Sequence, residues 1–136
     1  MRITAIPVPH LRISPQGFTF NAACMRLMRD VEYVQFLHHF EDGMLFAKEC
    51  SPLDADNTPW RLNCGSQKIY AKHVKWLKFY KFICGEMRWL SGNVYTIPAA
   101  LQKYDGKRYI FFDLAAARED SPLWNLRASE IQYITN

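Results

Sequence analysis

The sequence has no long hydrophobic run and no familiar catalytic motif. No stretch approaches the roughly 18 apolar residues that a membrane-spanning helix needs. Prolines stand at positions 7 and 9, where the apolar part of a signal peptide would begin. The motifs G-x-S-x-G, H-E-x-x-H, G-x-G-x-x-G and the P-loop are all missing. We therefore predict a cytoplasmic protein that is not an enzyme, uses no cofactor and does not enter a membrane.

Cysteine and histidine are few and show no metal-binding spacing. The four cysteines, which form no C-x-x-C pair, are Cys24, Cys50, Cys64 and Cys84. In a reducing compartment, scattered cysteines are mostly small buried hydrophobic residues. The neighbours His38 and His39 fall at the end of a predicted strand, where adjacent side chains point to opposite faces and cannot hold one ion. We predict free thiols and no metal site.

Hydrophobic and aromatic residues, in contrast, are plentiful. In a chain of 136 residues, 49% are hydrophobic and 15% are aromatic, which excludes a disordered protein. That length fits a single domain, which we take to be residues 1–136. So many rings indicate an aromatic core, an aromatic interface, or both.

The positive charge is concentrated in one segment. The chain has a net charge of +4, yet residues 66–88 alone contain six basic residues against Glu86. The remaining residues are close to neutral. A localised basic segment tells more about a partner than the total charge does.

Turn and cap signals predict two or three β-hairpins. Residues 10–14 and 18–20 flank a Pro-Gln-Gly turn, residues 31–40 and 44–48 flank Glu-Asp-Gly, and residues 94–104 and 107–114 flank Asp-Gly. Asn21 is predicted to cap a short helix over residues 22–29. Pro98 indicates an edge strand or a bulge. We also expect a loop over residues 51–65 with one short strand at 60–62, and a last strand at 131–134.

The longest predicted helix covers residues 67–84 and ends near Gly85. At 100° per residue, seven mainly apolar side chains share one stripe, which we assign to the core: Ile69, His73, Trp76, Leu77, Tyr80, Ile83 and Cys84. The predicted fold class is therefore α+β, with antiparallel β-hairpins packed on one long amphipathic basic helix.

The opposite side of this predicted helix is the candidate binding face. Lysines occupy it, and two phenylalanines lie among them, where a purely solvated face would carry none. Cations that neutralise phosphates, together with rings on which bases stack, are what a nucleic acid needs. The candidate residues are Lys68, Lys72, Lys75, Lys78, Phe79, Lys81, Phe82 and Arg88. The simpler alternative is the wet side of an ordinary amphipathic helix.

Several short stretches resemble small uncharacterised accessory proteins carried by phages and integrative elements of Gram-positive bacteria. They are residues 18–24 (FTFNAAC), 31–35 (VEYVQ), 47–50 (AKEC), Trp89, Tyr95 and residues 112–114 (FDL). This resemblance implies a mobile-element accessory protein, a group that commonly binds nucleic acid or blocks a host defence complex. It supplies no catalytic residues.

Three hypotheses follow. The first is a non-enzymatic accessory protein that contacts nucleic acid or a host nucleoprotein complex through the Lys-rich helix. The second is an inhibitor of host defence, similar to an anti-CRISPR protein, that binds a protein through the same face or through the acidic loop around Asp54 and Asp56. The third is a minor structural or assembly protein of the element. A homodimer is compatible with each of them.

Overall fold

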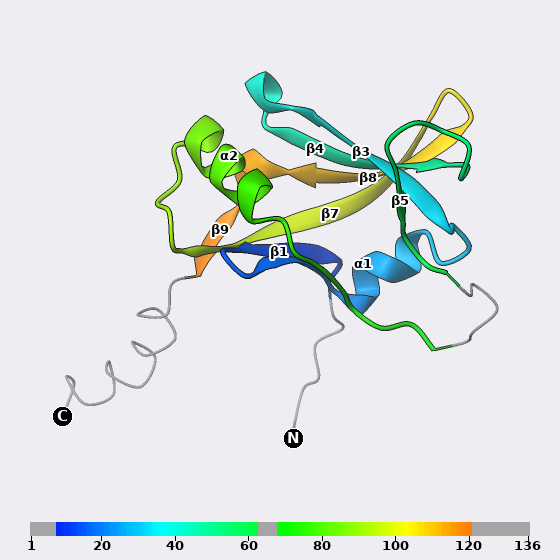
Figure 1. Ribbon diagram of the computed structural model, residues 1–136, viewed down its shortest axis with the longest axis horizontal. Helices are drawn as coiled ribbons and strands as arrows, with labels where there is room; N and C mark the ends of the chain where they lie inside the picture. Colours follow the sequence, from blue (N-terminus) through cyan, green and yellow to red (C-terminus); the bar gives the residue numbers. More distant parts are fainter. Residues whose placement is uncertain (1–7, 63–67, 121–136) are drawn as a thin grey trace.

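A single antiparallel sheet dominates the computed structural model, which describes residues 8–62 and 68–120. Its nine strands are β1 (His10–Ser14), β2 (Gly17–Phe20), β3 (Tyr33–His39), β4 (Met44–Cys50), β5 (Asn57–Pro59), β6 (Lys72–Val74), β7 (Val94–Tyr104), β8 (Lys107–Asp113) and β9 (Arg118–Asp120). Between them lie the helices α1 (Ala22–Leu27) and α2 (Leu77–Met87) and the 3-10 turns η1 (Phe40–Asp42) and η2 (Leu114–Ala116) (Figure 1).

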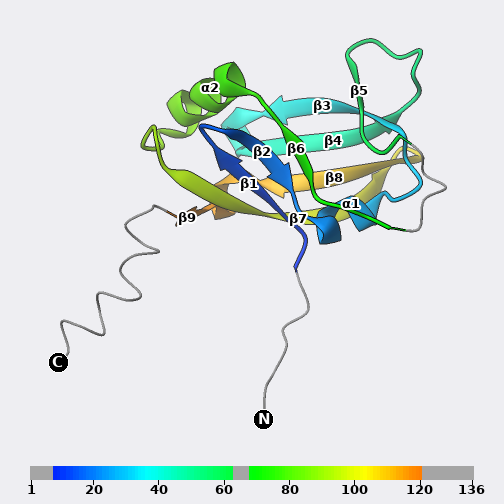
Figure 2. The same ribbon diagram turned by 60° about the horizontal axis from the view of Figure 1, so that its bottom comes forward.

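Strand β7 joins the two halves of this sheet. The strand order is β5-β3-β4-β8-β7-β1-β2-β6, and β9 pairs with the start of β7. Strand β7 pairs with β1 as far as Pro98 and with β8 from Ala99 onward. With this change of partner the sheet curls into half a barrel (Figures 1 and 2). Pro98 therefore lies at a corner inside the sheet, between the β9 and β8 ladders, and not on an edge strand.

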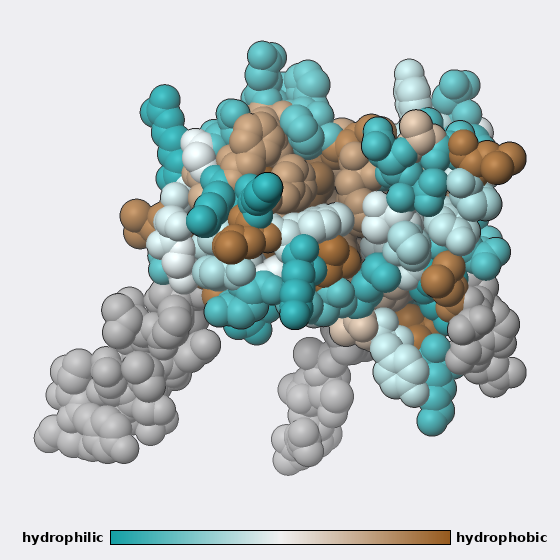
Figure 3. All heavy atoms as spheres, viewed as in Figure 1, coloured by the Kyte–Doolittle hydropathy of each residue, from teal (hydrophilic) through white to brown (hydrophobic). Residues whose placement is uncertain are grey.

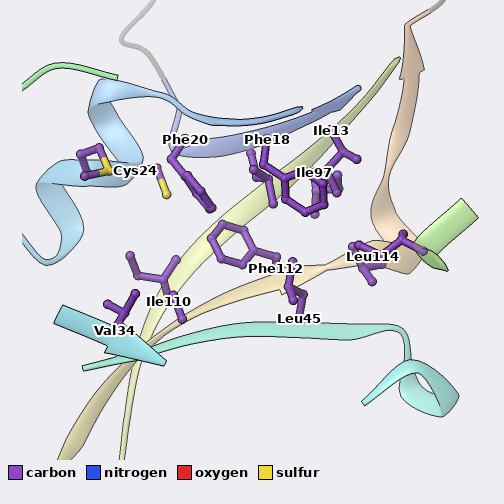
Figure 4. Close-up of a cluster of buried hydrophobic side chains, with 14 of the residues drawn as sticks. Ile13, Phe18, Phe20, Cys24, Val34, Leu45, Ile97, Ile110, Phe112 and Leu114 are labelled. Atoms are coloured by element: carbon purple, nitrogen blue, oxygen red, sulfur yellow. The ribbon is translucent and has the colours of Figure 1, made fainter. Parts of the chain in front are cut away.

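The concave side of the half barrel holds the core. In Figure 4, side chains from β1 and β2 point toward side chains from β4 and β8 across the interior. The completely buried residues include Leu11, Ile13, Phe18, Phe20, Val34, Leu45, Ile97, Ile110 and Phe112. Each such side chain contributes about 1.5–3 kcal/mol when it leaves water. The curl also brings β2 close to β3, as the stacking of the Phe20 and Phe36 rings at 5.7 Å shows.

The predicted hairpins and the predicted cap are confirmed. Strand β1 pairs with β2, β3 with β4, and β7 with β8. The side chain of Asn21 accepts a hydrogen bond of 2.9 Å from the backbone N–H of Cys24 at the start of α1. Asp105 and Gly106 both have positive φ, 51° and 78°, as a two-residue hairpin turn requires.

The predicted long helix is wrong in its first half. Residues 72–74 form β6, which pairs with β2, and the helix runs only from Leu77 to Met87. Exposure alternates along residues 72–76 with the period of a strand, so the helical spacing there was accidental. Pairing with the edge of β2 gives residues 72–74 interstrand hydrogen bonds in place of those of a helix.

The predicted fold class is therefore also wrong, because the helix is not the platform of the fold. Helix α2 is an 11-residue element at one end of a curled sheet. Its core side consists of Tyr80, Ile83 and Cys84, as predicted, but Leu77 is 51% exposed. Gly85 does not end the helix. The short strand expected at 60–62 is found instead as β5, and the strand expected at 131–134 lies outside the described residues.

Strand β6 lies unusually close to the first hairpin. Gly17 has φ +138°, and a Cβ at this position would lie 2.4 Å from the carbonyl oxygen of Val74. Only glycine permits this approach. The imidazole of His73 also joins β6 to the first hairpin by hydrogen bonds. Its Nε2 lies 3.0 Å from the carbonyl oxygen of Gln16, and its Nδ1 lies 2.8 Å from the hydroxyl of Thr19.

An ion-pair network ties the turn after α1 to β4 and β8. Arg108 donates to both oxygens of Asp30, at 2.8 and 2.9 Å, and to Glu49 at 3.0 Å. Hydrogen bonds from Arg108 are the main reason why the pKa values of both carboxyl groups lie below their ordinary range. The two carboxylates in turn raise the pKa of Arg108.

Candidate nucleic-acid interface

A cleft lined by aromatic rings lies between α2 and the end of β3. We call it the aromatic cleft, and its residues are Phe36, His38, Phe40, Trp76, Phe79 and Phe82. It consists of two adjoining hollows of about 230 and 480 Å³, and His38 lines both. Figure 3 shows hydrophobic side chains gathered in a hollow at the upper middle of the view, where Figure 1 places α2, β3 and β4.

Local structure explains why the rings meet there. Side chains alternate along β3, so Phe36 and His38 lie on the same concave side as the buried Val34. Helix α2 turns its buried face toward the core, which leaves Phe79 and Phe82 on the flank that faces β3. The turn η1 adds Phe40. The cleft therefore forms only because the sheet curls far enough to bring β3 beside α2.

The rings form a continuous set of contacts. The centroids of Phe36 and Trp76 lie 4.8 Å apart in an edge-to-face arrangement. The imidazole of His38 stacks on Phe40 at 4.2 Å, and Phe82 lies edge-on to Phe40 at 5.3 Å. Each ring pair of this type contributes about 0.5–1.5 kcal/mol beyond the burial of its surface. The cleft is thus a pre-formed surface of rings.

Burial falls steadily from the floor of the cleft to its rim. Phe79 is partly buried and stacks 5.5 Å from the core residue Phe18, so it also supports the fold. Phe82 is 45% exposed, and His38 is exposed as well. These two rim rings are the part of the cleft that a ligand can reach most easily.

Charge is distributed unevenly around the cleft. Lys75, Lys78 and Lys81 are all exposed, and Lys78 precedes Phe82 by four residues, so the two are neighbours on the helix surface. The smaller hollow has no carboxylate in its lining, whereas Glu41 and Glu86 line the larger one. An anionic backbone is therefore attracted to the part of α2 near Lys78, and hydrogen-bond donors are attracted to the two glutamates.

The structure separates the predicted binding residues into three places. Lys78, Phe79, Lys81 and Phe82 lie on α2, and Lys75 lies two residues before it. Lys68 and Lys72 line a different hollow of about 480 Å³, next to Trp60 and Tyr70, and partial burial lowers the pKa of Lys72. Arg88 ends α2 in a left-handed conformation with φ 57°. The single basic helix face of the prediction does not exist.

Sequence reasoning missed four of the six residues of the cleft. It read Phe36, His38 and Phe40 as part of a strand, considered His38 only as a metal ligand, and assigned Trp76 to a core stripe. The signal that was available is the run of rings at every second position, 36, 38 and 40, on one side of a strand. Whether that side is covered depends on a segment that follows about 40 positions later in the chain.

The alternative chemistries gain no support from the described residues. Cys24, Cys50 and Cys84 are free thiols, and burial raises the pKa of Cys24 to about 12, which makes it unreactive. Cys64 lies outside the described residues. Asp54 acts as a turn former and accepts a hydrogen bond of 2.8 Å from the backbone of Ser51.

No cluster of three or more metal-ligating side chains occurs within residues 8–62 and 68–120. In the same part of the chain, no helix has the length and apolar character to cross a bilayer. Comparison of the chain with protein families, with curated proteins and with solved structures found no match.

Proposed function

We propose that this protein binds single-stranded nucleic acid, free or within a nucleoprotein, through the aromatic cleft and the lysines beside it. It acts in the cytoplasm, without catalysis, as an accessory protein of a mobile genetic element. The observation that carries this proposal is the combination of half-exposed rings, above all Phe82 and His38, with the exposed lysines of α2. Rings alone would fit many ligands, and lysines alone would be an ordinary wet surface.

The geometry favours a single strand over a duplex. The rings line hollows and do not project from a ridge, so a base must leave its stack to reach them. Stacking of a base on an aromatic side chain contributes about 1–3 kcal/mol and tolerates any sequence. We propose that Lys75 and Lys78 contact the phosphates and that Glu41 and Glu86 accept hydrogen bonds from the amino groups of bases.

The test is fluorescence anisotropy with labelled oligo-dT, oligo-U and a duplex of equal length. We expect tighter binding of the single strands. Three phosphate contacts predict a log–log salt slope of about −2. Phe82→Ala should weaken binding by about 1–3 kcal/mol, and the double variant Lys75→Glu with Lys78→Glu should abolish it.

The matched control carries the same charge change elsewhere. Arg12 and Arg26 are exposed residues of β1 and α1, so replacing both with Glu also lowers the net charge by four units. We expect this control to keep most of its affinity. If it loses binding as completely as the lysine variant, the interaction is nonspecific attraction. No binding of any oligonucleotide at low salt would show that the proposed function is wrong.

A protein-binding inhibitor of host defence is the second candidate. Glu41 and Glu86 favour it, because carboxylates beside the rings repel phosphate but suit a protein surface with mixed charge. A pull-down from host lysate separates the two functions. Capture that survives nuclease treatment and depends on Phe82 supports protein binding, whereas nuclease-sensitive capture supports the proposed function.

A further inference from the structure

The outer face of the sheet carries a second group of exposed rings. These rings belong to side chains of β3, β4, β7 and β8 that point away from the core. On this face Leu37 pairs with Phe46, and Tyr109 pairs with both Lys48 and Gln102. A hollow of about 380 Å³ opens on this face, lined by Leu37, His38, Phe46, Gln102, Tyr104 and Tyr109. Nothing in the described part of the chain covers it.

This hollow and the aromatic cleft share one lining residue at the edge of β3. His38 lines the outer hollow and both hollows of the cleft. Strand β5 pairs with β3 only from Tyr33 to Gln35, so within the described residues no strand lies beyond β3 at positions 36–39. A flexible chain that leaves the cleft at His38 can therefore pass over this edge and reach the outer face directly.

The lining of the outer hollow fits bases and a phosphate backbone. Tyr104 is 74% exposed, and its ring lies 6.4 Å from that of Tyr109. The Nζ of Lys48 lies 6.0 Å from the centre of Tyr109, which places a cation beside the rings. Gln102 offers an amide that can pair with the edge of a base. No carboxylate lines this hollow, in contrast to the larger hollow of the cleft.

We infer that a bound single strand continues from the aromatic cleft over the free edge of β3 and stacks bases on Tyr104 and Tyr109 of the outer face. The inference rests on the proposed function and extends it: the site is longer than the cleft, and long oligonucleotides gain contacts that short ones do not make. A rigid duplex cannot follow this path around the edge.

The test measures the affinity of the variants Tyr104→Ala and Tyr70→Ala for oligo-dT of increasing length, from about 4 to about 20 nucleotides. The control is well matched, because Tyr70 is 70% exposed and lies outside both the cleft and the outer hollow. We expect Tyr104→Ala to lower the affinity for the longest oligonucleotide about tenfold, the loss expected for one stacked base, and to leave the shortest unchanged. Tyr70→Ala should resemble the unaltered protein at every length.

Every other outcome contradicts the inferred path, the proposed function, or both. If long oligonucleotides bind and Tyr104→Ala changes nothing, the outer face is not part of the site, although the proposed function stands. If no oligonucleotide binds, both fail. If sedimentation shows a dimer that Tyr104→Ala dissociates, the occupant of the outer face is a second copy of this chain, and the inferred path is wrong.

Discussion

Two groups of aromatic rings on the concave side of the same sheet differ in their exposure. Phe18, Phe20 and Phe112 are completely buried, whereas the rings of the aromatic cleft grade from half-buried Phe79 to Phe82 at 45% exposure. The first group gains the full benefit of leaving water, and the second gives part of it up. Leaving a cluster of rings exposed beside lysines lowers the stability of the fold, and a role of these rings in binding would explain why they are exposed. The contrast between the two groups also suggests how to separate effects on stability from effects on function.

The largest expected effect comes from the buried group. Phe20→Ala should lower the free energy of unfolding by about 3–5 kcal/mol, since Phe20 contacts Phe36, Trp60 and Phe112 and leaves a cavity. Phe82→Ala should lower it by no more than about 1.5 kcal/mol, because the ring is 45% exposed and contacts only the rim of the core through His38, Phe40 and Phe79. Urea denaturation measures both. Equal losses in the two variants would show that Phe82 is part of the core and remove the contrast.

A smaller loss is expected where β6 meets the first hairpin. Gly17→Ala places a Cβ against the carbonyl of Val74 and strains a positive φ, which should cost about 1–3 kcal/mol. Gly92→Ala is the control, because Gly92 also has a positive φ but no atom within 4 Å of the added Cβ. Thermal unfolding of both should show the larger loss at position 17. The reverse order would argue against the pairing of β6 with β2.

The Arg108 network predicts a dependence on pH. Arg108→Gln should lower the free energy of unfolding by about 1–2 kcal/mol at pH 7. Because the pKa values of Asp30 and Glu49 are lowered in the folded state, their stabilisation is complete above their ordinary values of 3.8 and 4.5 and is lost as pH falls through the lower, folded values. Between about pH 5 and pH 2, the unaltered protein should therefore lose more stability than the variant. Parallel curves would contradict this account.

The smallest effect is a gain. Arg88 ends α2 with φ 57°, a conformation that costs a residue with a side chain about 1 kcal/mol. Arg88→Gly should raise the stability by about that amount. Lys78→Gly, inside the same helix, should lower it by about 1 kcal/mol. A loss in both variants would mean that the arginine side chain stabilises the helix end.

Sequence reasoning succeeded where the signal was local. Asn21 before a helix and Asp105-Gly106 between two strands each specify their structure within a few residues, and both predictions are confirmed. It failed for residues 72–76, where both a helical and a strand period fit and only the distant edge of β2 decides between them. The aromatic cleft needs the curl of the whole sheet, which no short pattern encodes. Four of its six rings were therefore identified only in the structure.

The most direct test of the proposed interface is an NMR titration of the tryptophan side chains with a single-stranded oligonucleotide. Trp76 lies in the cleft and Trp60 is buried at 2% exposure, so the indole N–H signal of Trp60 is an internal control. Trp76→Phe and Trp60→Phe assign the two signals. We predict that the Trp76 signal shifts in proportion to binding while the Trp60 signal stays in place. A Trp76 signal that does not move during saturable binding would show that the nucleic acid occupies another surface and that the aromatic cleft is not the site.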